Sequence, residues 1–251
     1  MFMEWTRAAL KEKAKFSVKS FYWKSVLVAF ILTLISGGAG GGSGRGSEGE
    51  AADVGSVGGK ITGAITGRLA GPLLFFMGLA AVTIAVMAIL AIVLAIFVFR
   101  PLQVGCQKYF LEASEGKADL GNIGYGFKSN YMNIVGVTFL TDLFIVLWTL
   151  LLIVPGIIKE YQYRMIPYLL AEDPNLSFSE AKRLSTEMMD GEKWDAFVLD
   201  LSFILWHILS AVTFGLVGIF WVDPYVQYTD VELYKVLRTK VPGPYYAGNE
   251  Y

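Results

Sequence analysis

Long apolar stretches separated by short charged segments dominate the hydrophobic pattern of this chain. A helix needs about 20 predominantly apolar residues to cross the ~30 Å hydrocarbon core of a bilayer. Four stretches compete for that description, namely Ser25–Ser36, Pro72–Phe99, Ile134–Ile158 and Ala196–Val222. The second of them contains no charged residue. The pattern predicts an all-α fold, a multi-pass transmembrane helical bundle.

The number of crossings depends on whether the last two stretches are single helices or hairpins. Single helices give about four crossings and leave the basic residues of segment 159–194 outside the cell, although short cytoplasmic loops favour Lys and Arg. Hairpins that turn at Pro155-Gly156 and near Thr213-Phe214-Gly215 give about six crossings with both termini in the cytoplasm. We adopt six crossings and keep four as the alternative. With six, the basic residues clearly outside are Arg45, Lys60 and Arg68.

Residues 1–24 predict a basic amphipathic helix, with helical residues 3–20 on the cytoplasmic membrane surface. Its basic residues recur at every fourth position, as Arg7, Lys11, Lys15 and Lys19. Like charges at this spacing destabilise an isolated helix by roughly 1 kcal/mol in total. An anionic inner leaflet outweighs that cost, because it contributes about 1 kcal/mol per basic residue. The lipid bilayer, and its anionic inner leaflet in particular, is therefore an expected partner.

A glycine-rich segment, residues 37–71, predicts a flexible external loop. Within it, glycines recur at every fourth position, as Gly55, Gly59, Gly63, Gly67 and Gly71. On a helix this spacing makes a stripe of small residues where another backbone can approach closely. One interpretation is a face for self-association or for contact with another membrane protein. The other is coincidence in a glycine-rich stretch.

Two further amphipathic helices are predicted on the cytoplasmic side. The first, Pro101–Ser114, begins with a proline, which suits the first turn of a helix. The second begins at Ser177, where Ser177 and Glu180 form a capping box, and ends at Gly191. We expect both helices to lie on the inner leaflet or to cover the cytoplasmic mouth of the bundle.

Composition and charge exclude several functional classes. The chain is 55% hydrophobic and 17% charged, with a formal net charge of −1, so no nucleic-acid partner is expected. A single cysteine and a single histidine give neither an internal disulfide nor a histidine-rich metal site. No phosphate-binding loop, metal-ligand spacing or nucleophile motif is present. We therefore expect no cofactor, no metal and no enzymatic activity.

Ionisable residues inside the predicted spans are the only chemical signal. Each costs about 2.5–3.5 kcal/mol on insertion scales, so it usually faces the bundle interior and has a partner. With six crossings, Asp142, Arg164 and Asp200 share one depth on three helices, where an arginine can bridge two carboxylates. The remaining candidates are Lys159, Glu160 and His207 in a second layer, and Asp223 before Pro224. They are interpreted either as ion pairs that set helix register or as a polar cavity or ion relay.

The segment Leu151–Trp194 and the segments that begin at Phe197 and Val222 resemble a known bacterial family. The most specific elements are the Pro-Gly break, the Ser-x-x-Glu-Ala sequence at Ser177 and the Asp-Pro-Tyr sequence at Asp223. The chain is similar to the domain of unknown function 975 family, multi-pass membrane proteins found mainly in Firmicutes. The resemblance implies an integral membrane protein without assigned catalytic residues. The Pro-Gly hairpin is also similar, more distantly, to the membrane domain attached to some glycerophosphodiesterases.

Together these features predict that residues 1–251 form a single integral domain of the cell membrane. The favoured function is that of a non-enzymatic accessory or scaffold bundle for another membrane process. The alternative is a small transporter or channel-like protein that uses the polar layer within the membrane.

Overall fold

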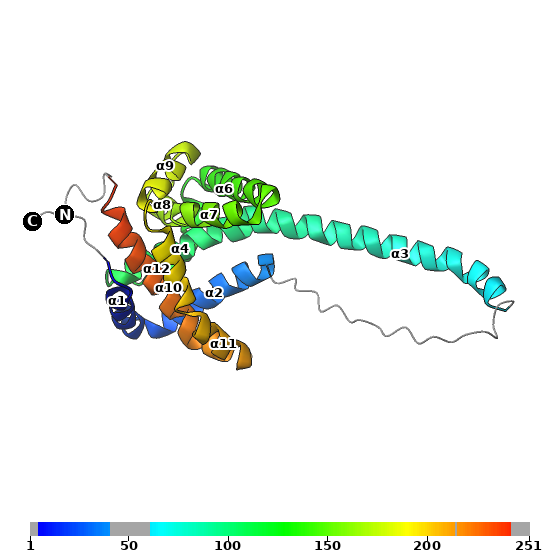
Figure 1. Ribbon diagram of the computed structural model, residues 1–251, viewed down its shortest axis with the longest axis horizontal. Coiled ribbons are helices and arrows are strands. Elements are labelled where there is room, and N and C mark those ends of the chain that lie inside the picture. The colour runs from blue at the N-terminus through cyan, green and yellow to red at the C-terminus, as the bar shows by residue number, and fades with distance from the viewer. Residues whose placement is uncertain (1–4, 41–60, 214, 242–251) are drawn as a thin grey trace, which may run out of the picture.

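The computed structural model describes residues 5–40, 61–213 and 215–241, and these ranges are α-helical with short connections and no strand (Figure 1). Three helices are long and apolar enough to span a membrane: Phe75–Ser114, Tyr131–Leu151 and Lys193–Val212. A fourth results if the pair Arg7–Ser20 and Tyr22–Leu34, bent by 110°, counts as one span. The predicted all-α class with several candidate spans is confirmed, whereas helix lengths alone do not fix the number of crossings.

A compact group of helices lies at one end of the molecule, and we call it the basal core. It consists of α1 (Arg7–Ser20), α4 (Arg100–Ser114), α8 (Ile166–Glu172), α9 (Phe178–Met188) and α12 (Asp223–Arg238). Its centre is aromatic: the ring of Phe110 lies edge-on to those of Tyr109 and Tyr228, with centroids 5.3 and 5.2 Å away. All three side chains are fully buried. Such edge-to-face contacts add to the stability that burial alone provides.

Helix α1 begins later than predicted, at Arg7, because the Thr6 side chain accepts a hydrogen bond from the backbone N–H of Ala9 and caps it. It packs on α12 through a buried apolar face that includes Leu10 and Ala14. The basic residues of α1 lie on its other faces. The predicted division of this helix into an apolar and a basic side is therefore present in the structure.

Helix α4 differs from the interfacial helix predicted for Pro101–Ser114, because it is buried at the centre of the basal core. Two short helices, η2 (Leu120–Gly124) and α5 (Tyr125–Lys128), fold back over it. Glycines make this approach close: a Cβ on Gly105 would lie 2.1 Å from the carbonyl oxygen of Ile123. The polar face of this helix, which the sequence assigns to solvent, is thus partly covered by η2 and α5.

The predicted glycine-rich loop is shorter than residues 37–71. Helix α2 (Tyr22–Gly40) continues into it, and α3 (Ile61–Leu94) begins within it. Gly63, Gly67 and Gly71 are therefore helical, whereas Gly55 and Gly59 lie outside the described residues.

The first hairpin consists of α6 (Tyr131–Leu151) and the antiparallel α7 (Ile153–Tyr163), followed by α8. Its two ends meet: the amide of Asn130 donates to the side-chain oxygen of Asn175 at 2.8 Å. Close by, the amide of Asn133 donates to the carbonyl oxygen of Pro174, also at 2.8 Å. The chain therefore leaves the basal core at α6 and returns to it at the end of α8.

The turn of this hairpin is at Leu152, before the predicted break at Pro155 and Gly156. Pro155 lies in the first turn of α7, where a missing backbone N–H removes no helical hydrogen bond. Gly156 lies where α7 touches α6, and a Cβ there would be 2.3 Å from the Thr149 hydroxyl oxygen. The Pro-Gly pair thus lies near the start of the returning helix α7 and lets it pack closely on α6.

The second hairpin runs outward through α10 (Lys193–Leu201) and α11 (Ile204–Val212), and returns through a π-helical turn, η3 (Gly218–Val222), into α12. Gly215 in the tip has φ +84°, a left-handed conformation that favours glycine. The ends again meet, since Glu192 before α10 pairs with Lys240 after α12. Glu192 also accepts a hydrogen bond from the indole of Trp5 at 2.8 Å, so both ends of the described chain lie beside this hairpin's base.

Large apolar side chains cover the outer surfaces of α3, α6, α7 and α11. Every residue from Phe75 to Leu94 in α3 is exposed, and α3 extends away from the other helices (Figure 1). Soluble proteins rarely expose such continuous apolar surface. The molecule thus combines a compact basal core with apolar helices that suit a lipid environment.

Candidate functional site

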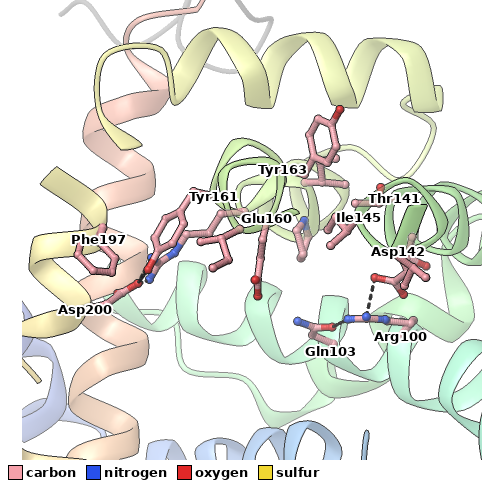
Figure 2. A pocket seen from close by; sticks show the side chains of 16 residues that line it. Arg100, Gln103, Thr141, Asp142, Ile145, Glu160, Tyr161, Tyr163, Phe197 and Asp200 are labelled. Atoms are coloured by element: carbon pink, nitrogen blue, oxygen red, sulfur yellow. Dashed lines mark hydrogen bonds and ion pairs between the residues drawn. The ribbon is translucent and has the colours of Figure 1, made fainter. Parts of the chain in front are cut away.

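A polar cavity of about 690 Å³ lies between α4, α6, α7 and α10 (Figure 2). Its polar lining consists of Arg100, Gln103, Asp142, Glu160, Tyr161, Arg164 and Asp200. Apolar side chains such as Ile145 and Phe197 complete the walls. Four of the residues that the sequence nominates as an intramembrane polar layer, Asp142, Glu160, Arg164 and Asp200, therefore surround one cavity.

Arg164, at the break between α7 and α8, joins two carboxylates. Its guanidinium donates to both oxygens of Asp200 on α10, at 2.6 and 2.9 Å, and to Asp230 on α12 at 2.8 Å. The hydroxyl of Tyr161 also donates to Asp200, at 2.8 Å. We call Arg164, Asp200 and Asp230 the ionic cluster. It connects the first hairpin to α10 and α12 of the second.

Asp230 is the member that the sequence analysis missed. Asp230 follows the last predicted apolar stretch, which ends at Val222, so it is not among the ionisable residues expected inside the spans. The signal that would have found it is its spacing, because Asp230 shares a helix face with the buried Leu233 and Leu237. Burial raises the pKa of the Asp230 carboxyl, and the adjacent Arg164 guanidinium opposes that rise.

Asp142 does not contact Arg164, contrary to the predicted three-residue layer. It accepts a hydrogen bond at 2.6 Å from Arg100, which is not among the candidate residues from the sequence. The same guanidinium donates to Gln103 at 2.8 Å, which fixes its orientation (Figure 2). Arg100 reaches the cavity because α4 continues from α3 through a π-helical turn, η1 (Ala95–Phe99), and passes beside α6.

Glu160 differs from the other acids of the cavity, because it makes no hydrogen bond or ion pair with the residues that the structure describes. Figure 2 shows its carboxylate between the ionic cluster and the Arg100–Asp142 pair, directed toward α4. The lining carries two arginines against three acids, counting Asp142, Glu160 and Asp200. The cavity therefore has an excess of negative charge, and Glu160 is its unpaired group.

Three other predicted residues lie outside the cavity. Lys159 donates to Gln162 at 2.8 Å and lies 5.4 Å from the ring centroid of Trp148. His207 is exposed on α11. Asp223, at the start of α12, accepts a hydrogen bond from the hydroxyl of Thr33 at 2.6 Å. Lys159 and Asp223 thus join neighbouring helices, and the three residues form no second polar layer.

The chain was compared with protein families, curated proteins and solved structures. A family model described as a protein of unknown function, DUF975, matches residues 73–241, more than half of the chain. The chain belongs to the DUF975 family. The family region contains both hairpins and every residue of the polar cavity, and it begins after α1 and α2. No curated protein and no solved structure matches this DUF975 chain.

Proposed function

We propose that this DUF975 protein is a non-enzymatic, multi-pass protein of the cell membrane that acts as an accessory or scaffold bundle for another membrane process. Six crossings follow if each hairpin enters the bilayer from the basal core and returns to it. Basic residues support this orientation, because Lys182, Lys193 and Lys240 all lie at the basal end, as the cytoplasmic preference for positive charge requires. Both termini then lie in the cytoplasm.

The observation that carries the accessory role is the separation of α3 from the rest of the bundle. Over Phe75–Leu94 all of its side chains are exposed, so a partner helix can pack on it without displacing any contact of this chain. Close packing is what drives helix association within a bilayer. The cavity charges support the same role, since most of them pair with one another and join helices together.

Photo-crosslinking along α3 tests this proposal in native membranes. A photoreactive amino acid would replace consecutive residues from Ile84 to Leu90, one at a time, and Leu205 on α11 would serve as the exposed control. We expect protein adducts that recur every three or four positions, from one face of α3, and only lipid adducts at Leu205. Two differently tagged copies distinguish self-association from contact with another protein. Lipid adducts at every α3 position would contradict the proposal.

The polar cavity supports a second candidate function, a transporter or channel-like protein for a small cation or proton. Glu160 carries this alternative, because it is an unpaired carboxylate in a cavity with excess negative charge. Proton flux into proteoliposomes should then be lost in Glu160→Gln and retained in Glu187→Gln, an exposed acid on α9. Equal flux in both variants and in the unmodified protein would exclude a role for this carboxylate in proton movement.

A further inference from the structure

A second cavity, of about 660 Å³, lies between α1 and the second hairpin, away from the polar cavity. Its lining includes three lysines of α1, Lys11, Lys15 and Lys19, and four aromatic residues, Tyr22, Trp206, Trp221 and Tyr225. We call it the lysine groove. The lysines come from one helix and the tryptophans from α11 and η3, so cationic and aromatic groups face the same space.

Two of the three lysines are free to bind a ligand. Lys15 and Lys19 are exposed and form no hydrogen bond or ion pair with the described residues. Lys11 is held in place: its ammonium donates to the Ser202 hydroxyl at 2.6 Å and lies 4.1 Å from the ring centroid of Phe203. No acidic residue lines the groove. The ligand that complements this end carries a negative charge, and a phosphate accepts hydrogen bonds from several ammonium groups at once.

The aromatic end of the groove selects an apolar group. Trp206 and Trp221 keep 40% and 50% of their surface exposed, and both belong to the hairpin that extends away from the basal core. Tyr22 fixes the bend between α1 and α2, because its hydroxyl donates to the carbonyl oxygen of Phe220 at 2.9 Å. The groove therefore lies where the basic helix meets the apolar ones, at a bend of 110°. Tryptophan and tyrosine are enriched at this level of a membrane.

We propose that the lysine groove binds one anionic phospholipid, with its phosphate at Lys15 and Lys19 and the start of its acyl chains against Trp206 and Trp221. The charge of one end and the aromatic character of the other both match this ligand, whereas a soluble anion matches only the first. The site is more specific than the general attraction of a basic helix to an anionic leaflet. It rests on the membrane placement of α1 and is independent of the accessory role.

Native mass spectrometry of the full chain in detergent, with equal amounts of phosphatidylglycerol and phosphatidylcholine, tests the site. We expect one phosphatidylglycerol molecule to be retained in preference to phosphatidylcholine. The double variant Lys15→Gln/Lys19→Gln should lower this preference about 30-fold, since each basic residue contributes roughly fivefold. The matched variant Arg7→Gln/Lys13→Gln removes the same charge from exposed positions of α1 outside the groove. It should keep the preference for phosphatidylglycerol.

Tryptophan fluorescence gives an independent measurement. Phosphatidylglycerol with brominated acyl chains should quench the unmodified protein more strongly than brominated phosphatidylcholine, and Trp206→Phe/Trp221→Phe should remove that difference. In the mass-spectrometry experiment, an equal loss of the phosphatidylglycerol preference in the two charge variants would overturn the proposal in favour of nonspecific surface attraction. Displacement of the lipid by inorganic phosphate would identify a site for a soluble anion instead. Absence of any preference for phosphatidylglycerol would also refute it.

Discussion

Replacement of Arg164 by methionine tests whether the ionic cluster holds the two hairpins together. The substitution keeps an unbranched side chain but removes three N–H···O hydrogen bonds, of 2.6, 2.8 and 2.9 Å. Asp200 then retains only the hydroxyl of Tyr161, and Asp230 keeps no hydrogen bond with the described residues. The Asp230 carboxylate remains largely buried, that of Asp200 is half-buried, and the two are close enough to repel each other.

The expected loss follows from this geometry. Removing one partner of a buried ion pair costs about 3–5 kcal/mol, because an uncompensated charge stays behind. The side chain of Arg164 is 19% exposed and that of Asp230 is 15% exposed, so solvent screens this pair poorly, whereas the side chain of Asp200 is 35% exposed. Arg183→Met is the matched control, since Arg183 and Glu187 form a single pair whose side chains are 55% and 44% exposed. An exposed pair contributes at most about 1 kcal/mol.

Equilibrium unfolding of the full chain in mixed micelles, followed by far-UV circular dichroism, measures both free energies of unfolding. The triple variant Arg164→Met/Asp200→Asn/Asp230→Asn should recover most of the stability, because no uncompensated charge remains. If Arg164→Met is no less stable than Arg183→Met, the cluster does not hold the hairpins together. If the triple variant is as unstable as the single one, lost packing rather than unpaired charge is the cause.

Two other predictions concern the hairpins. Gly156→Ala should destabilise the protein by about 1–3 kcal/mol in the same unfolding assay, because its Cβ would overlap α6. Gly136→Ala is the control: its Cβ would meet open space, so this variant should be neutral or slightly stabilising. Equal effects of the two substitutions would disprove the close contact at Gly156. Single cysteines at the exposed positions Ser177 and Leu152 should react with a membrane-impermeant thiol reagent from opposite sides of sealed vesicles. Reaction of both from the same side would contradict the fold-back of the first hairpin.

The sequence by itself determined the helical class and the candidate spans. Runs of apolar residues as long as Pro72–Phe99 leave few alternatives, because backbone groups in an apolar environment must bond within a helix. It also indicated two breaks, at Pro155-Gly156 and near Gly215, since these residues interrupt apolar runs. The first turn was predicted at Pro155-Gly156, later in the chain than its position at Leu152, because proline is compatible with the start of a helix as well as with its end.

Only the tertiary structure decided which charges meet. The residue count along a helix gives the depth of Asp142, Arg164 and Asp200, but it does not give the rotation of a helix or the identity of its neighbour. Arg164 therefore has Asp230 as its second partner, and Asp142 has Arg100, although neither partner was nominated from the sequence. Hydrophobic periodicity is a property of one segment, whereas an ion pair needs two segments brought within about 3 Å of each other, and only the packed chain specifies that distance.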